Sequence, residues 1–185
     1  LAVFLFRIWF PSTIGRRIPT ELDREINDLI LKKGQALSIT ESIRFVMEML
    51  IAAPRFTKFS SESLEALVVL VAVFSLSGIS FAVGQKILNY AANHAHEQDH
   101  RSRIATEFMR SFHNLVSGNW KDETYDPKIA EIGTQLGDLY NTVSSMGMIA
   151  HIYLERGDRT AWIILEQLDH VAEIYEYEYG RLARY

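Results

Sequence analysis

The chain contains no cysteine and only four prolines among its 185 residues. The absence of cysteine excludes disulfide bonds and thiolate metal sites. No basic block stands out and the net charge is −4, which argues against a nucleic-acid partner. The alternating pattern of β-strands is missing as well, whereas apolar residues recur at steps of three and four. The sequence therefore predicts an all-α protein.

The most informative feature that is present is a run of nineteen residues without a charge, 66–84. As one helix it spans about 28 Å, close to the ~30 Å hydrocarbon layer of a bilayer. We therefore expect a single transmembrane helix over 62–86 and a membrane location. The chain is then divided into an N-terminal region, 1–61, the span, and an extramembrane region, 87–185. The alternative is a core helix of a helical bundle, which is also apolar on all sides.

Ser77, Ser80 and Gly84 share one face of this expected helix, because they are spaced by three and four residues. In a membrane, small residues let a neighbouring helix approach closely. This face predicts contacts with other transmembrane helices, with other subunits or with a second copy of the chain. Membrane lipid would surround the remaining faces.

The first ten residues are also apolar, but they are too short to cross a bilayer, and Arg7 interrupts them. They are interpreted either as a helix that lies in the interface or on the protein, or as the end of a first, partial span. Arg16 and Arg17 follow and favour a cytoplasmic N-terminal half.

Two amphipathic helices precede the run. The first is expected over 21–33, with Thr20 as its cap and Gly34 as its end. The second begins at a capping box, 38–41, and ends at Pro54. Their apolar sides either pack against each other or lie on a membrane surface. These sides consist of Leu22, Ile26, Leu29 and Ile30 in the first helix and Ile39, Ile43, Val46, Met47 and Leu50 in the second.

The region after the run predicts an extramembrane bundle of three helices. Gly118 ends the first of them, Asp126 and Pro127 begin the second, and Gly157 separates it from the third, over 159–183. A link this short forces two helices into an antiparallel hairpin. The second helix carries eight apolar residues at alternating steps of three and four: Ile129, Ile132, Leu136, Leu139, Val143, Met146, Ala150 and Tyr153.

One motif suggests catalysis. His96-Glu97-x-x-His100 matches the zinc-peptidase pattern, in which two histidines one helical turn apart bind Zn²⁺ and the glutamate acts as general base. A later acid, Glu107 or Glu123, would supply the third ligand. The motif predicts a membrane-anchored zinc-dependent hydrolase as an alternative function.

The surroundings of this motif favour a simpler interpretation. Glu97 with Arg101, and Asp99 with Arg103, form acid-to-base pairs four residues apart, as on a solvated helix. The extension by a glycine and a third histidine is missing, and so is a strand that could bind a substrate peptide. A second set of possible ligands, on one face of the last helix, is also expected to be solvated: Glu166, His170 and Glu173.

No motif identifies a family. The layout predicts a non-enzymatic, membrane-anchored helical accessory or assembly subunit of a larger membrane complex. Enzymatic activity stays open, although the sequence favours its absence, and no cofactor is expected apart from zinc in the hydrolase alternative. The third hypothesis is a soluble all-helical interaction module whose core helix resembles a span.

Overall fold

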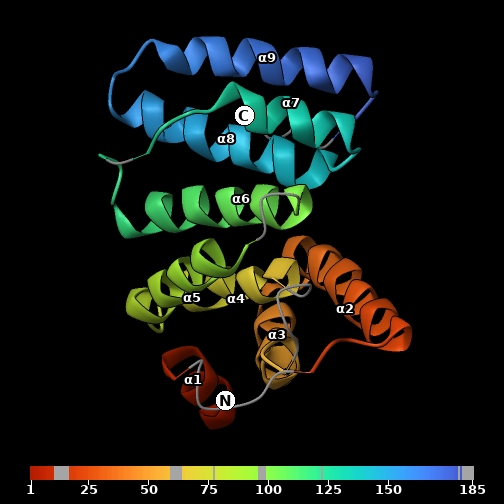
Figure 1. The fold of residues 1–185 in the computed structure, drawn as a ribbon. Helices are drawn as coiled ribbons and strands as arrows, with labels where there is room; N and C mark the ends of the chain where they lie inside the picture. Colours follow the sequence, from red (N-terminus) through yellow and green to blue (C-terminus); the bar gives the residue numbers. More distant parts are fainter. Residues whose placement is uncertain are drawn as a thin grey trace. The chain divides into compact units, whose positions relative to one another are not determined.

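The computed structural model describes residues 1–10, 17–58, 64–76, 78–95, 99–121, 123–178 and 180. These residues form nine α-helices and no strand (Figure 1), which confirms the predicted all-α fold class. The helices belong to two compact units, Leu1–Glu97 and Gln98–Tyr185. We refer to them as unit 1 and unit 2 and describe each by itself.

Unit 1 is built around one apolar helix. Helix α4 buries nine of its side chains, and α2, α3 and α5 pack against it. The short helix α1 packs on α3 and α5, and its Phe4 ring stacks on Phe74 of α4 at 6.0 Å between centroids. The helices of unit 1 are α1 (Ala2–Trp9), α2 (Glu21–Thr40), α3 (Ser42–Phe56), α4 (Leu64–Leu76) and α5 (Phe81–His94).

The uncharged run is not a single helix. Helix α4 ends at Leu76, and α5 begins at Phe81 and packs back against α4. Between them, Gly78 has φ +65°, and the Ser80 hydroxyl accepts a hydrogen bond from Val83 N at 3.3 Å as the cap of α5. Glycine adopts positive φ at little cost, and serine is a preferred helix cap, so these residues favour a turn at this point.

The predicted transmembrane helix over 62–86 is therefore wrong, and so is the membrane location. With 13 residues, α4 is about 20 Å long. No helix in the described part of the chain is long and apolar enough to cross a bilayer. The cytoplasmic orientation inferred from Arg16 and Arg17 depended on that span and is therefore unsupported. Arg16 itself lies outside the described residues. Helix α1 has eight residues and buries Phe4 and Ile8, so among the earlier interpretations it is a helix docked on the protein.

The capping of α2 by Thr20 is confirmed, but the end of this helix was predicted too early. The Thr20 hydroxyl accepts a hydrogen bond from Asp23 N, and the Asp23 carboxylate accepts one from Thr20 N. Helix α2 then continues through Gly34, where a Cβ would lie 3.2 Å from Met49 Cε. Gly34 is thus a point of close packing against α3 rather than a helix end.

The predicted capping box at 38–41 is wrong. The hydroxyls of Ser38 and Thr40 donate to backbone carbonyls within α2, those of Gln35 and Ala36. Serine and threonine hydroxyls can bond to backbone carbonyls three or four residues earlier as well as to the backbone N–H groups at a helix start. These residues therefore occur near the end of a helix as well as at its beginning. Pro54 lies in the last turn of α3, which ends two residues later at Phe56.

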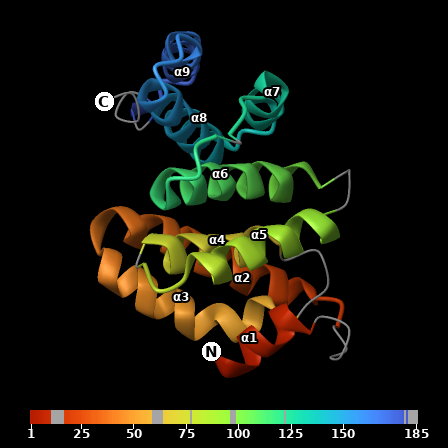
Figure 2. The ribbon, with the colours of Figure 1, turned by 90° about the vertical axis from the view of Figure 1, so that its left-hand side faces the viewer.

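The described residues of unit 2 form four helices where the sequence predicted three. They are α6 (His100–Ser117), α7 (Pro127–Gln135), α8 (Leu139–Glu155) and α9 (Thr160–Ile174), and α8 lies between α6 and α9 (Figure 2). The helix that begins at Pro127 breaks at Gly137, which has φ +70°, and Asp138 caps α8. Gly118 ends α6 as predicted, with φ +73°.

Candidate functional site

Helix α2 buries polar residues and exposes leucines. Asp23 and Asn27 are buried on its inner face, whereas Leu22 and Leu29 are 64% and 65% exposed. Of the predicted apolar side of this helix, Leu22 and Leu29 therefore point outward, whereas Ile26 and Ile30 are half-buried. The physical reason is a set of polar contacts that fixes the rotation of α2 about its own axis.

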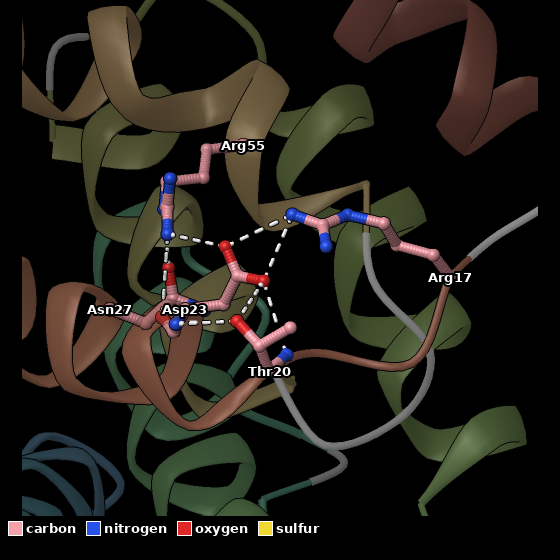
Figure 3. A network of polar contacts seen from close by, with 5 residues as sticks. All are labelled: Arg17, Thr20, Asp23, Asn27 and Arg55. Carbon is pink, nitrogen blue, oxygen red and sulfur yellow. Dashed lines mark hydrogen bonds and ion pairs between the residues drawn. The ribbon is translucent and has the colours of Figure 1, made fainter.

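These contacts converge on the Asp23 carboxylate (Figure 3). Arg55 of α3 donates to Asp23 Oδ1 at 3.0 Å and to Asn27 Oδ1 at 2.9 Å. Arg17 lies 2.9 Å from Asp23 Oδ2, and the Thr20 hydroxyl donates to the same oxygen at 2.8 Å. Two guanidinium groups and the helix cap thus hold one carboxylate between α2 and α3.

The charge of Asp23 is favoured by this environment. Burial alone raises the pKa of a carboxyl, but the hydrogen bonds from Thr20 and the charges of Arg17 and Arg55 outweigh it. The pKa of Asp23 consequently lies below its ordinary value. An ionised Asp23 keeps Arg55 and α2 in place. The internal contacts of unit 1 therefore hold Leu22 and Leu29 on its outside.

The outer face of α3 is apolar too. Ile43, Met47 and Ile51 are 81%, 60% and 78% exposed and follow one another at intervals of four residues, on one side of the helix. We call these three residues the α3 stripe. The opposite side of α3 supplies the core of unit 1 with Phe45, Met49, Ala53 and Phe56. A helix that covers a core usually presents polar residues to water, so the α3 stripe requires an explanation.

The charged residues near the α3 stripe are paired within unit 1. Arg44 lies 3.0 Å from Glu48 and 3.4 Å from Glu41, and Lys33 of α2 is also bonded to Glu48. The hydrogen bonds from Lys33 and Arg44 hold the pKa of Glu48 below its ordinary value. An incoming apolar surface would therefore meet compensated charges beside the stripe.

The predicted zinc motif lies only partly within the described residues. His96 and Glu97 lie outside the described residues, and His100 is the exposed first residue of α6. Glu107 pairs with Arg110 at 2.6 Å, and the buried Glu123 carboxylate accepts hydrogen bonds from Ser111 and Asn114. Among the described residues, no group of three or more histidines and acids could hold a metal ion.

Glu123 has a structural position that the sequence did not reveal. Its carboxylate accepts from Ser111 Oγ at 2.6 Å and from Asn114 Nδ2 at 2.5 Å, while its carbonyl accepts from Arg156 at 3.0 Å. These bonds tie the loop after α6 to α6 and to Arg156, the residue directly after α8. Ser111 and Asn114 are three residues apart on α6 and therefore share one face of that helix. This spacing was the one feature of the sequence that could have indicated a shared polar partner.

The other predicted site residues are placed as follows. Ser77 lies outside the described residues, Ser80 caps α5, and Gly84 is buried within that helix. Glu166 and His170 line a groove between α7 and α9, and Glu173 is exposed further along α9.

No protein-family model, no curated protein and no solved structure matches this chain. Among the places where unit 1 exposes apolar side chains are Leu22 and Leu29 of α2 and the α3 stripe.

Proposed function

We propose that this protein is a non-catalytic helical interaction module, which assembles with a second copy of itself through the α3 stripe. The observation that carries the proposal is the exposure of Ile43, Met47 and Ile51 along one side of α3. This hypothesis keeps the interaction role expected from the sequence and does not require a membrane.

The stripe is symmetric about its middle residue. Isoleucines lie four residues before and four residues after Met47. When two α3 helices pack antiparallel about a two-fold axis at Met47, each Ile43 meets Ile51 of the second copy. A two-fold interface uses the same patch on both subunits, and this spacing makes the patch complementary to itself.

The charged residues beside the α3 stripe are also compatible with contact between two copies of the chain. Arg44 is already paired with Glu41 and Glu48, so two copies would bring compensated rather than like charges together. Charges of the same sign in contact would oppose association. The favourable free energy of association then comes from the burial of apolar side chains.

The size of the stripe sets the expected affinity. Burying an exposed Ile or Met side chain contributes roughly 1.5–3 kcal/mol, so six such side chains supply on the order of 10 kcal/mol. Association itself costs about 4–15 kcal/mol. The two terms leave a surplus of at most about 6 kcal/mol, so we expect a reversible dimer with a Kd of roughly tens of micromolar or weaker.

Sedimentation equilibrium of the purified chain over a range of concentrations tests this proposal. We expect a monomer–dimer equilibrium in the wild type and a monomer for Met47→Glu, because two carboxylates would meet at the axis. Ile174→Glu is the matched control, since Ile174 of unit 2 is 59% exposed and Met47 is 60% exposed. A wild-type monomer at all concentrations, or a dimer that survives Met47→Glu, would overturn the proposal.

The geometry of the pair can be tested by cross-linking, because the chain has no cysteine of its own. A disulfide needs Cβ atoms about 3.5–4.5 Å apart. Met47→Cys, at the axis, should cross-link with itself under oxidation. Ile43→Cys should not, because eight residues of helix separate the two copies of this position by about 12 Å. Mixing Ile43→Cys with Ile51→Cys should restore the cross-link. In a parallel arrangement Ile43→Cys would instead cross-link with itself and the mixture would form no mixed cross-link, while Met47→Cys would cross-link in both arrangements.

A further inference from the structure

Unit 2 contains a cavity that the proposed function does not use. It has a volume of about 270 Å³ and lies between α6, α7, α8 and the segment that precedes α7. Ile104, Met146 and Ile149 form part of its apolar wall. Its volume is close to the lower end of the roughly 300–1,000 Å³ of ordinary ligand sites, so an occupant would be small.

Three charged residues of α6 line this cavity: Arg103, Glu107 and Arg110. Positions three and four apart share one face of a helix. The carboxylate oxygens of Glu107 lie 2.6 and 2.7 Å from Arg110 Nη1, so these two residues neutralise each other. The Arg103 guanidinium has no such bond to another side chain in the described part of the chain.

The remaining acid in the lining is Asp126, and it has a role of its own. It caps α7, and its carboxylate accepts a hydrogen bond from Lys128 N at 3.0 Å. The positive end of the helix dipole compensates a carboxylate at this position. Of the charged residues in the lining, Arg103 is therefore the one that can bind an occupant of the cavity.

We propose that this cavity binds a small monocarboxylic acid with an apolar body. The carboxylate pairs with Arg103, whose guanidinium can donate two parallel hydrogen bonds to it. The apolar body lies against Ile104, Met146 and Ile149. An aliphatic or aromatic acid of about ten non-hydrogen atoms suits a cavity of this size.

Titration of the full chain with octanoate, below its micellar concentration, tests this inference by isothermal calorimetry. Octanol and octylamine are the matched probes, because they keep the apolar body and change the head group. We expect saturable binding of octanoate, with octanol at least tenfold weaker and no saturable binding of octylamine. Equal binding of octanol, stronger binding of octylamine, or no saturable binding of octanoate at millimolar concentration would overturn the proposal.

Variants on α6 locate the site. Arg103→Gln should weaken octanoate binding at least tenfold, whereas Arg101→Gln, an exposed position two residues earlier on the same helix, should leave it unchanged. Both side chains are exposed, so neither substitution should affect folding, and circular dichroism checks this. Equal affinities in the two variants would place the acid elsewhere and overturn the assignment. Chemical shifts of the Ile149 methyl groups should move with octanoate in the wild type, and unmoved shifts would also contradict it.

Discussion

The Arg55 guanidinium lies 3.0 Å from the Asp23 carboxylate and joins the last turn of α3 to the first turn of α2. Because Arg55 also donates to Asn27, two polar side chains of α2 are turned inward. Leu22 and Leu29 of α2 consequently face outward. An ion pair inside unit 1 thus determines which apolar residues reach the surface.

Asp23→Asn should destabilise unit 1 and make it less sensitive to acid. The pKa of Asp23 is lower in the folded chain than in the unfolded chain, so its ionisation stabilises the fold above the ordinary carboxyl pKa. This contribution is lost as the pH falls through the folded pKa, below about pH 4. At pH 7 we expect a Tm lower by roughly 5–10 °C, and between pH 5 and pH 3 a shallower decline than in the wild type.

Thermal unfolding followed by circular dichroism at several pH values measures this effect. Asp28→Asn is the control, because Asp28 is exposed on the same helix and, among the described residues, pairs with its neighbour in the next turn, Lys32. An Asp23→Asn curve parallel to the wild-type curve would contradict a special role for this carboxylate.

Gly78→Ala should destabilise the chain by about 1–2 kcal/mol, the cost of a side chain in the left-handed region. Gly78 has φ +65°, and no atom in the described part of the chain lies within 4 Å of an added Cβ, so we attribute the effect to the backbone. In a continuous helix the same change would instead stabilise by roughly 0.5–1 kcal/mol. Urea unfolding gives the sign, and Ala92→Gly, at an exposed position inside α5, shows the effect of the reverse exchange within a helix.

Gly133→Ala should loosen the packing of α7 on α8. A Cβ at Gly133 would lie 2.0 Å from Thr142 Oγ1, so one of the helices must shift. We expect a loss of about 1–3 kcal/mol in the free energy of unfolding, as for other overpacked sites. In a double-mutant cycle, Thr142→Ala should recover part of this loss, because it removes the nearest atom. Strictly additive effects of the two substitutions would show that the residues do not meet.

Local signals in the sequence predicted much of the secondary structure. Thr20 caps α2, Pro127 begins α7, and Gly118 ends α6, each through chemistry that a single residue carries. The Gly157 link between α8 and α9 was also predicted, and Thr160 N donates to Asp158 beside it. Caps and turns depend on near neighbours, which is why they could be predicted without the tertiary structure.

Tertiary context decided what the sequence could not. Ser80 and Gly84 suit a helix face in a membrane as well as a turn and a buried helix, and hydropathy alone favoured the first interpretation. The polar residues Asp23 and Asn27 turned inward because Arg55, 28 residues after Asn27, provides their partner. A contact between residues so far apart in the sequence does not affect the spacing of apolar residues within α2, so that spacing could not reveal it. The same holds for the cavity in unit 2, whose walls come from three helices.

The fold-back of the uncharged run between α4 and α5 is tested most directly by one distance. Spin labels at Glu65→Cys and Asn93→Cys report it, because the chain has no other cysteine. A continuous helix would hold these positions about 42 Å apart, since 28 residues separate them. Two packed helices lie 8–10 Å apart, so we predict a distance below roughly 20 Å by double electron–electron resonance. A distribution centred near 40 Å would contradict the hairpin and the structure of unit 1 that is built on it.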